Sequence, residues 1–465
     1  MSISSLLNVS KDAMLSYQLA MDVTGGNISN VNTPGYTRQR ALMVASGTVN
    51  AKSASAQLSV RVEKIDRMFD SYTEMQIAEQ SQKVGAGEAK NDMLKRVETV
   101  LDETNGRKLN DVMSRFWSAW DDVAGNPAGK VERDALASVG QEMAGMFNSY
   151  GNQLYELQMS ANDTIKNTLA DINVYTGEIA SLNRQIGQIS DTSGEANQLL
   201  DERNVVLKKL CGLINCQYIE GANSSLNIYL ANGKPLVEGD MSHGLALKKS
   251  GSAVFPDVVY SATGENVNAF LLPGKGKLGS LLDIRDRIIP EYMARLDDMA
   301  GTIMDQVNEI HRRGFDAKRN AGGDFFITIP ENSKAYARDM AISGAILADS
   351  GRIAASATVA GDGDQAAAIA ALKDELLMNG GQATLSSFYA SLIGQVARDV
   401  AEAGRNSEYQ ANVLNQLTNQ REGISGVSVD EEMMNLIKYQ MGYNAAGKLC
   451  QVVDEMMETL MSLVR

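Results

Sequence analysis

Apolar residues recur every seven positions in the first 30 residues or so of the chain. Two interleaved rows follow this spacing, and the second row also contains two polar residues. The rows are Leu7, Met14, Met21 and Ile28, and Ile3, Ser10, Tyr17, Thr24 and Val31. A seven-residue repeat forms a stripe along one side of a helix and is typical of helices that pair lengthwise. We therefore predict an N-terminal helix that ends at the turn made by Pro34 and Gly35.

The last 37 residues show the same spacing with fewer interruptions. The rows are Leu436, Tyr443, Cys450, Met457 and Val464, and Tyr439, Ala446, Val453 and Leu460. Acidic residues occupy positions 430–432, in the first turn, where carboxylates stabilise the positive end of the helix dipole. The pattern predicts a helix over residues 430–464, about 50 Å long.

A seven-residue stripe is most often ordinary core. Two observations favour a role in assembly here. Both stripes lie at the ends of the chain, where segments normally fray, and both are rich in Met, Leu and Tyr. We expect the two helices to pair with each other and with neighbouring copies. The expected contact residues are Leu7, Met14, Tyr17 and Met21 at the N-terminus, and all nine positions of the two C-terminal rows.

The segment between these ends predicts a mainly α fold with a small β domain (α+β). Helical spacing covers 68–120 and 130–210, short β-rich runs separated by glycine turns cover 212–272, and helical spacing returns at 278–313, 365–380 and 384–422. Residues 314–364 are irregular. We predict a terminal coiled-coil-like domain (1–60 plus 423–465), a helical-bundle middle domain (61–211 plus 273–422) and an inserted, outward-facing β-rich domain (212–272).

Composition narrows the possible partners. The 465 residues carry a formal net charge of −14, so the chain repels phosphate backbones and anionic membrane surfaces. No apolar run approaches the roughly 18–20 residues that span a bilayer. The first residues also lack the basic and apolar segments of a cleavable signal peptide. Taken alone, these features predict a cytoplasmic protein that binds no nucleic acid and inserts in no membrane.

The sequence contains only weak signals for catalysis, nucleotide binding or metal binding. Gly274, Gly276 and Gly279 match the G-x-G-x-x-G pattern, but helical spacing continues where a dinucleotide fold needs a second strand, so a glycine-rich helix start is favoured over a nucleotide-binding enzyme. His243 and His311 lie far apart and lack metal-ligand spacing. We expect no catalytic residue, cofactor or metal.

The three cysteines, Cys211, Cys216 and Cys450, are too few for a disulfide framework. The spacing of the first two permits a bridge. We favour their interpretation as small apolar residues.

One segment resembles a known family. Asn27, Ile28, Ser29, Asn30, Val31, Asn32, Thr33, Pro34, Gly35 and Tyr36 resemble the signature after the first helix of the axial rod, hook and hook-associated proteins of the bacterial flagellum. The continuation 37–40 resembles the hook-associated members. Segments similar to that family follow in the expected order at 199–204, 231–237, 277–286, 320–326 and 426–446. Cys450 is unusual for such proteins.

The resemblance implies a structural component that joins hook to filament by self-assembly, with its terminal helices lining an inner tube. It implies four partners: further copies in a ring or helical assembly, the hook protein, a second junction protein next to the filament, and an export chaperone on the C-terminal helix. It also implies an extracellular location reached by type III export without a cleaved signal, in place of the cytoplasmic prediction. Another axial protein (hook, distal rod or flagellin-like) is the alternative.

Overall fold

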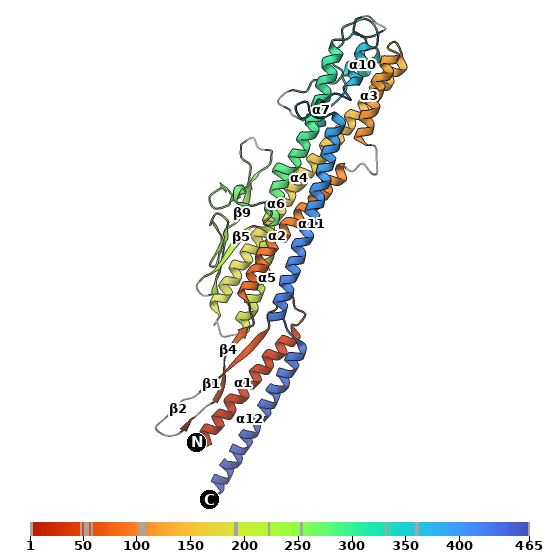
Figure 1. Ribbon diagram of the computed structural model, residues 1–465. Coiled ribbons are helices and arrows are strands. Elements are labelled where there is room, and N and C mark those ends of the chain that lie inside the picture. Colours follow the sequence, from red (N-terminus) through yellow and green to blue (C-terminus); the bar gives the residue numbers. More distant parts are fainter. Residues whose placement is uncertain are drawn as a thin grey trace. The chain divides into compact units, whose positions relative to one another are not determined.

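Long amphipathic segments with few prolines form most of the structure. We analysed a computed structural model that describes residues 3–46, 49–50, 55–56, 59–101, 108–189, 194–221, 224–251, 254–330, 333, 335–358 and 362–463 (Figure 1). The helices are α1 (Ile3–Ser29), α2 (Ser71–Leu101), α3 (Leu109–Gly125), α4 (Lys130–Gln188), α5 (Gly194–Leu213), α6 (Lys277–Asp283), α7 (Ile289–Arg312), α8 (Tyr336–Asp339), α9 (Gly344–Ala348), α10 (Asp364–Ala371), α11 (Leu385–Ser425) and α12 (Val429–Leu463).

The mainly α prediction is confirmed, with local corrections. The single helical stretch predicted over 130–210 is two helices, because α4 ends at Gln188 and α5 begins at Gly194. The turn-forming sequence Asp-Thr-Ser-Gly at 191–194 was the overlooked signal. The helix predicted over 365–380 is the short α10, which ends at Ala371.

Small antiparallel sheets lie where the β-rich region was predicted. One sheet has the order β5-β6-β7-β8 and another the order β11-β10-β9. Their strands are β5 (Cys216–Glu220), β6 (Leu226–Leu230), β7 (Pro235–Glu238), β8 (Met241–Ser242), β9 (Leu245–Lys248), β10 (Asp257–Tyr260) and β11 (Glu265–Asn266). Alternate residues Leu226, Ile228 and Leu230 are buried, as the period of a half-buried strand requires.

A further hairpin near the N-terminus was not predicted. Strand β1 (Gln39–Ser46) pairs antiparallel with β4 (Ser59–Arg67), and β2 (Val49–Asn50) pairs with β3 (Ser55–Ala56). The β1–β4 register shifts between Leu42 and Met43. Because a bulge of this kind moves later side chains to the other face, it breaks the alternation by which a strand is recognised in sequence.

The chain divides into two compact units. Unit 1 comprises Met1–Gly85, Thr168–Gly276 and Tyr409–Arg465, and unit 2 comprises Ala86–Asn167 and Lys277–Glu408. Helices α2, α4 and α11 each contribute residues to both units. The sequence-based division into terminal, middle and β domains stays a prediction.

Unit 2 contains a buried aromatic cluster around His311. The His311 ring lies against Trp120 and Phe325, with ring centroids 6.1 and 5.7 Å away. Its Nδ1 lies 2.6 Å from the carbonyl oxygen of Gly323, and its Nε2 accepts a hydrogen bond of 2.8 Å from the backbone N–H of Ala354. The neutral imidazole therefore ties two parts of the irregular segment 314–356 to the end of α7.

We predict an acid-sensitive stability from this histidine. Burial lowers the pKa of His311 from 6.5 to about 4. Because the unfolded chain binds the proton more tightly, this contribution to the free energy of unfolding is complete above pH 6.5 and is lost as the pH falls towards 4, by about 2 to 3 kcal/mol at pH 4.5. Denaturant titrations at pH 7 and 4.5 measure it. His311→Gln should lose less stability than the wild type over this range. Equal pH dependence of the two proteins would contradict the assignment.

Candidate functional site: the paired terminal helices

Helices α1 and α12 pair lengthwise within unit 1, as predicted (Figure 1). Asn27 contacts Glu432, and Tyr17 lies beside Gly442, so the two helices run antiparallel. A Cβ atom at Gly442 would lie 2.6 Å from the Tyr17 ring. A side chain at 442 would therefore require the Tyr17 ring to shift.

The predicted C-terminal contact residues differ in burial along α12. Ala446 and Val453 are buried, and Leu436, Tyr439, Tyr443 and Cys450 are half-buried. Met457 and Leu460 are 50% and 48% exposed. Val464 lies outside the described residues. On α1, Met14, Tyr17 and Met21 are half-buried and Leu7 is exposed.

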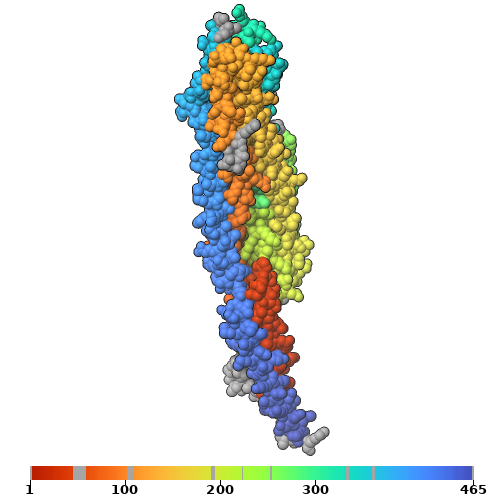
Figure 2. Space-filling model, turned by 90° about the vertical axis from the view of Figure 1, so that its right-hand side faces the viewer, coloured from red at the N-terminus to blue at the C-terminus, as the bar shows by residue number. Residues whose placement is uncertain are grey.

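The exposure of Met457 and Leu460 follows from unequal helix lengths. Helix α1 has 27 residues and α12 has 35. The register set by Asn27 with Glu432, and by Tyr17 with Gly442, places Ile3 opposite Met456. The last turns of α12 therefore extend past α1, which Figure 2 shows at the end of the chain. Among the described residues, no helix covers the continuation of the apolar stripe there.

A second apolar surface lies on α12 away from the stripe. Ile437, Met441, Val452 and Met456 are between 44% and 68% exposed. Their spacings of four and eleven residues return to one side of a helix. With their neighbours they form the outer α12 surface, which we define as Met433, Met434, Ile437, Met441, Leu449, Val452 and Met456.

Small and polar residues of α1 face its β-hairpin. The buried positions of α1 are Ser5, Ser10, Ser16, Ala20, Thr24 and Asn27. Ser16 Oγ donates to the carbonyl oxygens of Asp12 and Val60, at 2.7 and 2.9 Å. Ser10 and Thr24 interrupt the apolar row, and their hydroxyls donate to the carbonyl oxygens of Leu7 and Ala20 in the same helix at 3.1 and 2.9 Å.

Asn27 is the centre of a polar anchor at the base of the helix pair. It is fully buried. Its Nδ2 donates to the Gln39 carbonyl oxygen at 2.8 Å and to Glu432 Oε2 at 2.9 Å. Its Oδ1 accepts from the Tyr36 hydroxyl at 2.9 Å and from the Gln39 N–H at 3.0 Å. The two donors and two acceptor positions of the amide are thus all used.

Arg38 extends this anchor across the start of α12. Its guanidinium contacts Glu431 Oε2 and Glu432 Oε1, both at 2.7 Å. Its backbone N–H donates to the Ser425 carbonyl oxygen at 2.9 Å. Glu432 therefore has a cation on one oxygen and an amide donor on the other, which compensates for its burial.

Arg421, in the last turn of α11, holds the turn of the family motif. Its Nη2 donates to the carbonyl oxygens of Gly35 and Tyr36 at 3.2 and 3.0 Å. Its Nε contacts Glu74 Oε1 at 3.2 Å. Neither Arg421 nor Glu74 is identifiable from the sequence, because neither belongs to a local pattern and they are 347 residues apart.

Asp201 of α5 completes the anchor. It accepts from the Thr37 backbone N–H at 2.9 Å and contacts Arg67 Nη2 at 2.7 Å. Burial raises the pKa of Asp201, and the charge of Arg67 acts in the opposite direction. Burial, with the charges of Asp201 and Glu432, also raises the pKa of Tyr36 to about 12, so its hydroxyl stays a donor. We use the name polar anchor for Asn27, Tyr36, Thr37, Arg38, Glu74, Asp201, Arg421 and Glu432.

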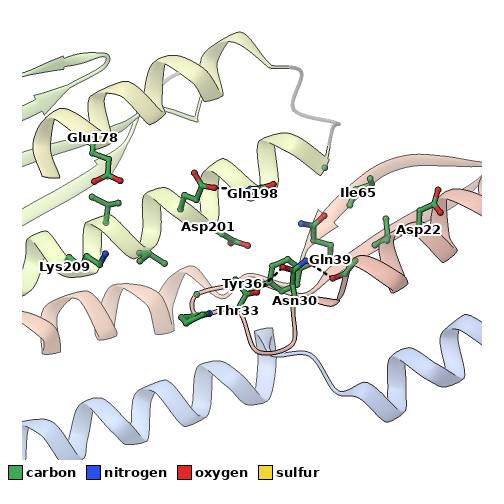
Figure 3. Close-up of a pocket in the computed structure, with 18 of the residues that line it drawn as sticks. Asp22, Asn30, Thr33, Tyr36, Gln39, Ile65, Glu178, Gln198, Asp201 and Lys209 are labelled. Carbon is green, nitrogen blue, oxygen red and sulfur yellow. Dashed lines mark hydrogen bonds between the residues drawn. The ribbon is translucent and has the colours of Figure 1, made fainter. Parts of the chain in front are cut away.

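The other motif residues shape the turn. Asn30 and Ser29 donate back to the carbonyl oxygens of Gly26 and Gly25, and Thr33 donates to Asn30 Oδ1. Ile28 is half-buried, and Asn32 and Pro34 are exposed. A pocket of about 660 Å³ lies between this turn, α1 and α5 (Figure 3). Carboxylates dominate its charged lining, namely Asp22, Glu178, Asp201 and Glu202 against Lys209.

The other motifs considered for ligand binding in the sequence have structural roles in the fold. Gly274 and Gly276 adopt φ values of +84° and +76° and lead into α6, and the described residues that follow contain no named strand that could complete a dinucleotide fold. In the described part of the chain, no group of three or more His, Cys, Asp or Glu is placed to hold a metal ion. Among the same residues, no helix is long and apolar enough to cross a membrane.

Comparison with known proteins agrees with this architecture. The family model described as the flagellar hook-associated protein FlgK helical domain matches residues 94–326, half of the chain. Models of the flagellar basal body rod FlgEFG protein C-terminal region and of the flagella basal body rod protein match residues 421–463 and 7–37, the two paired helices.

Individual relatives match over nearly the whole chain. Flagellar hook-associated protein 1 of Bacillus subtilis is 28% identical, with 98% of this chain and 97% of that protein covered. Its Escherichia coli namesake is 25% identical, with 99% and 100% covered. A solved structure, the flagellar hook junction protein FlgK from Burkholderia pseudomallei, has the same fold, with a TM-score of 0.67 and 16% identity over 75% of this chain and 100% of that one.

The helix pair and these matches define the class of the chain, a structural component of the bacterial flagellum. Within that class it belongs to the FlgK family of flagellar hook-associated proteins. The match over the helical middle separates it from the rod proteins, whose models match only its ends. It is therefore part of the extracellular flagellum.

We predict that the polar anchor controls the stability of the helix pair. Asn27→Ala leaves Glu432 and the Gln39 backbone with unsatisfied buried groups, which should cost about 2 to 4 kcal/mol. Hydrogen exchange of α1 and α12 amides measures the loss. The exposed motif residue Asn32 provides the control, because Asn32→Ala should change exchange by no more than about 0.5 kcal/mol. Equal effects of the two substitutions would contradict the role of Asn27.

A second prediction concerns Gly35. It has a φ of +81°, and a Cβ there would lie 2.3 Å from Val205 Cγ2. Gly35→Ala should lower the melting temperature for both reasons. Adding Val205→Ala removes the clash, so the double mutant should recover part of the loss but retain the left-handed penalty of about 1 to 2 kcal/mol. Gly25→Ala, in open space on α1, should be neutral or stabilising. If the effects of Gly35→Ala and Val205→Ala on stability simply add in the double mutant, the two residues do not clash.

Proposed function

We propose that this protein joins the flagellar hook to the filament, and that α1 and α12 form its assembly contacts. The observation that carries the proposal is the apolar surface of α12. Helix α1 covers only one side and part of its length, while Met457, Leu460 and the outer α12 surface stay exposed. A surface of this kind associates with other proteins or leads to aggregation. The solved relative is named a hook junction protein, which supports the same placement.

The expected partners follow from this surface. Further copies of the chain would cover the outer α12 surface in a ring or helical assembly, with the hook protein on one side and a second junction protein on the filament side. Before assembly the same surface needs protection, which an export chaperone bound to α12 would provide. Export through the flagellar type III apparatus belongs to the same proposal.

The number of exposed apolar residues on α12 supports docking by this helix. The outer α12 surface also carries polar side chains, because the exposed Asn444 and Gln451 lie seven and fourteen residues after Ile437, on nearly the same side of the helix. A monomer that worked alone would have no reason to keep eleven large apolar side chains exposed in the described part of α12.

We predict that Met457→Asp abolishes assembly and leaves the monomer folded. Met457 is half-exposed in the monomer, so the substitution should change the melting temperature little. In an assembly it would bury a carboxylate without a partner, at a cost of several kcal/mol per subunit. Cells with this variant should release unpolymerised flagellin and fail to swim, as scored by motility and electron microscopy.

The matched control is Gln451→Asp, which adds the same charge at an exposed position of α12 that already carries a polar side chain. It should support normal filaments. Normal swimming by Met457→Asp would refute the proposed role of the exposed stripe, and equal loss in both variants would show a general intolerance of charge on α12.

A further inference from the structure

Two thiols lie side by side at the junction between α5 and the small β region. Cys211 is in the last turn of α5, and Cys216 is the first residue of β5. Their Sγ atoms are 3.6 Å apart, and both residues are buried, with 0% and 4% of their surface exposed. Both belong to unit 1. Cys450, the third cysteine of the chain, lies on α12.

The backbone between the two thiols is held from both sides. Gln82 Nε2 donates to the Cys216 carbonyl oxygen at 2.8 Å. A Cβ at Gly85 of α2 would lie 1.9 Å from the Gly212 carbonyl oxygen, so these two backbones are in direct contact. A Cβ at Gly276 would likewise lie 2.6 Å from the Ile214 backbone. The turn 212–215 is therefore fixed, and the two sulfur atoms stay opposite each other.

This geometry is close to that of a disulfide. The bonded distance is about 2.05 Å, and the remaining gap is of the size that rotation about the two Cα–Cβ bonds closes. Such a rotation leaves the backbone contacts of Gly212 and Ile214 in place. The cysteines thus meet one requirement for a bridge, which is two sulfur atoms held near each other on a fixed backbone.

We propose that Cys211 and Cys216 form an intramolecular disulfide once the chain is outside the cell. Extracellular proteins keep disulfides because no thiol pool reduces them there. The oxidant is a low-molecular-weight disulfide. One cysteine thiolate attacks it and releases one small thiolate, and the second cysteine thiolate then attacks the mixed disulfide and releases the other. The two cysteines lose two electrons and two protons, and two small thiols carry them away.

Burial determines when this reaction occurs. The hydrogen bond to Cys211 and burial raise the pKa of the Cys216 thiol, so the thiolate is scarce in the folded state. Oxidation therefore takes place while unit 1 folds or opens locally. Once formed, the bond is shielded from reductants by the same burial. It ties the end of α5 to the edge strand of the β5–β8 sheet.

The test is oxidative refolding followed by thiol counting. The purified full-length protein is unfolded, refolded with oxidised glutathione, unfolded again without reductant and alkylated. We expect a mass lower by two hydrogen atoms and one alkyl label, on Cys450. A sample reduced before alkylation should carry three labels. The oxidised protein should also melt at a higher temperature than the reduced one.

Variants separate this reaction from side reactions. Cys450→Ser should keep the mass loss and the shift in melting temperature, whereas Cys216→Ser should lose both. The melting temperature of Cys216→Ser under reducing conditions, compared with that of the reduced wild type, shows whether the fold depends on the Cys216 thiol itself. Three labels on the oxidatively refolded wild type would overturn the proposal. A stable glutathione adduct on Cys211 or Cys216 in place of the bridge would overturn it too.

Discussion

The arrangement of the two chain ends depends on one buried amide. Asn27 uses all of its hydrogen-bonding capacity, and its partners come from three places: the end of the motif turn, the start of β1 and the first turn of α12. A buried amide of this kind tolerates few alternatives, because each misplaced partner leaves a polar group without a bond. It therefore selects one register of α1 against α12, which apolar contacts alone specify weakly. The same register determines how far α12 extends past α1.

Charged groups extend this selection to the rest of unit 1. Arg421 connects the motif turn to α2 through Glu74, and Asp201 connects it to α5. Buried ion pairs add little net stability, since desolvation offsets their attraction. Their effect here is on orientation, because removing one partner leaves another buried charge unpaired. The helix pair is thus attached to the rest of unit 1 by contacts that depend on direction.

Sequence reasoning predicted the elements whose signals are local and periodic. The seven-residue spacing located both terminal helices, and glycine turns between alternating strands located the β5–β11 region. It missed the β1–β4 hairpin, where a bulge shifts the alternation between Leu42 and Met43. It also missed Arg421 and Glu74, since a bond across 347 residues has no local pattern. The motif from Asn27 to Tyr36 was recognised by resemblance, but the reason for its first asparagine became visible only with Glu432 beside it.

The covalent path between the two units has a mechanical consequence. The chain passes from one unit to the other at four points, and three of these lie inside α2, α4 and α11. A tensile load across the boundary is therefore divided among four backbones, where a single linker would carry all of it. Stretching a helix breaks its hydrogen bonds one turn after another, which dissipates energy before any backbone is fully extended. A fibre component subject to repeated bending and torque thereby gains redundancy: one cut peptide bond leaves three continuous connections.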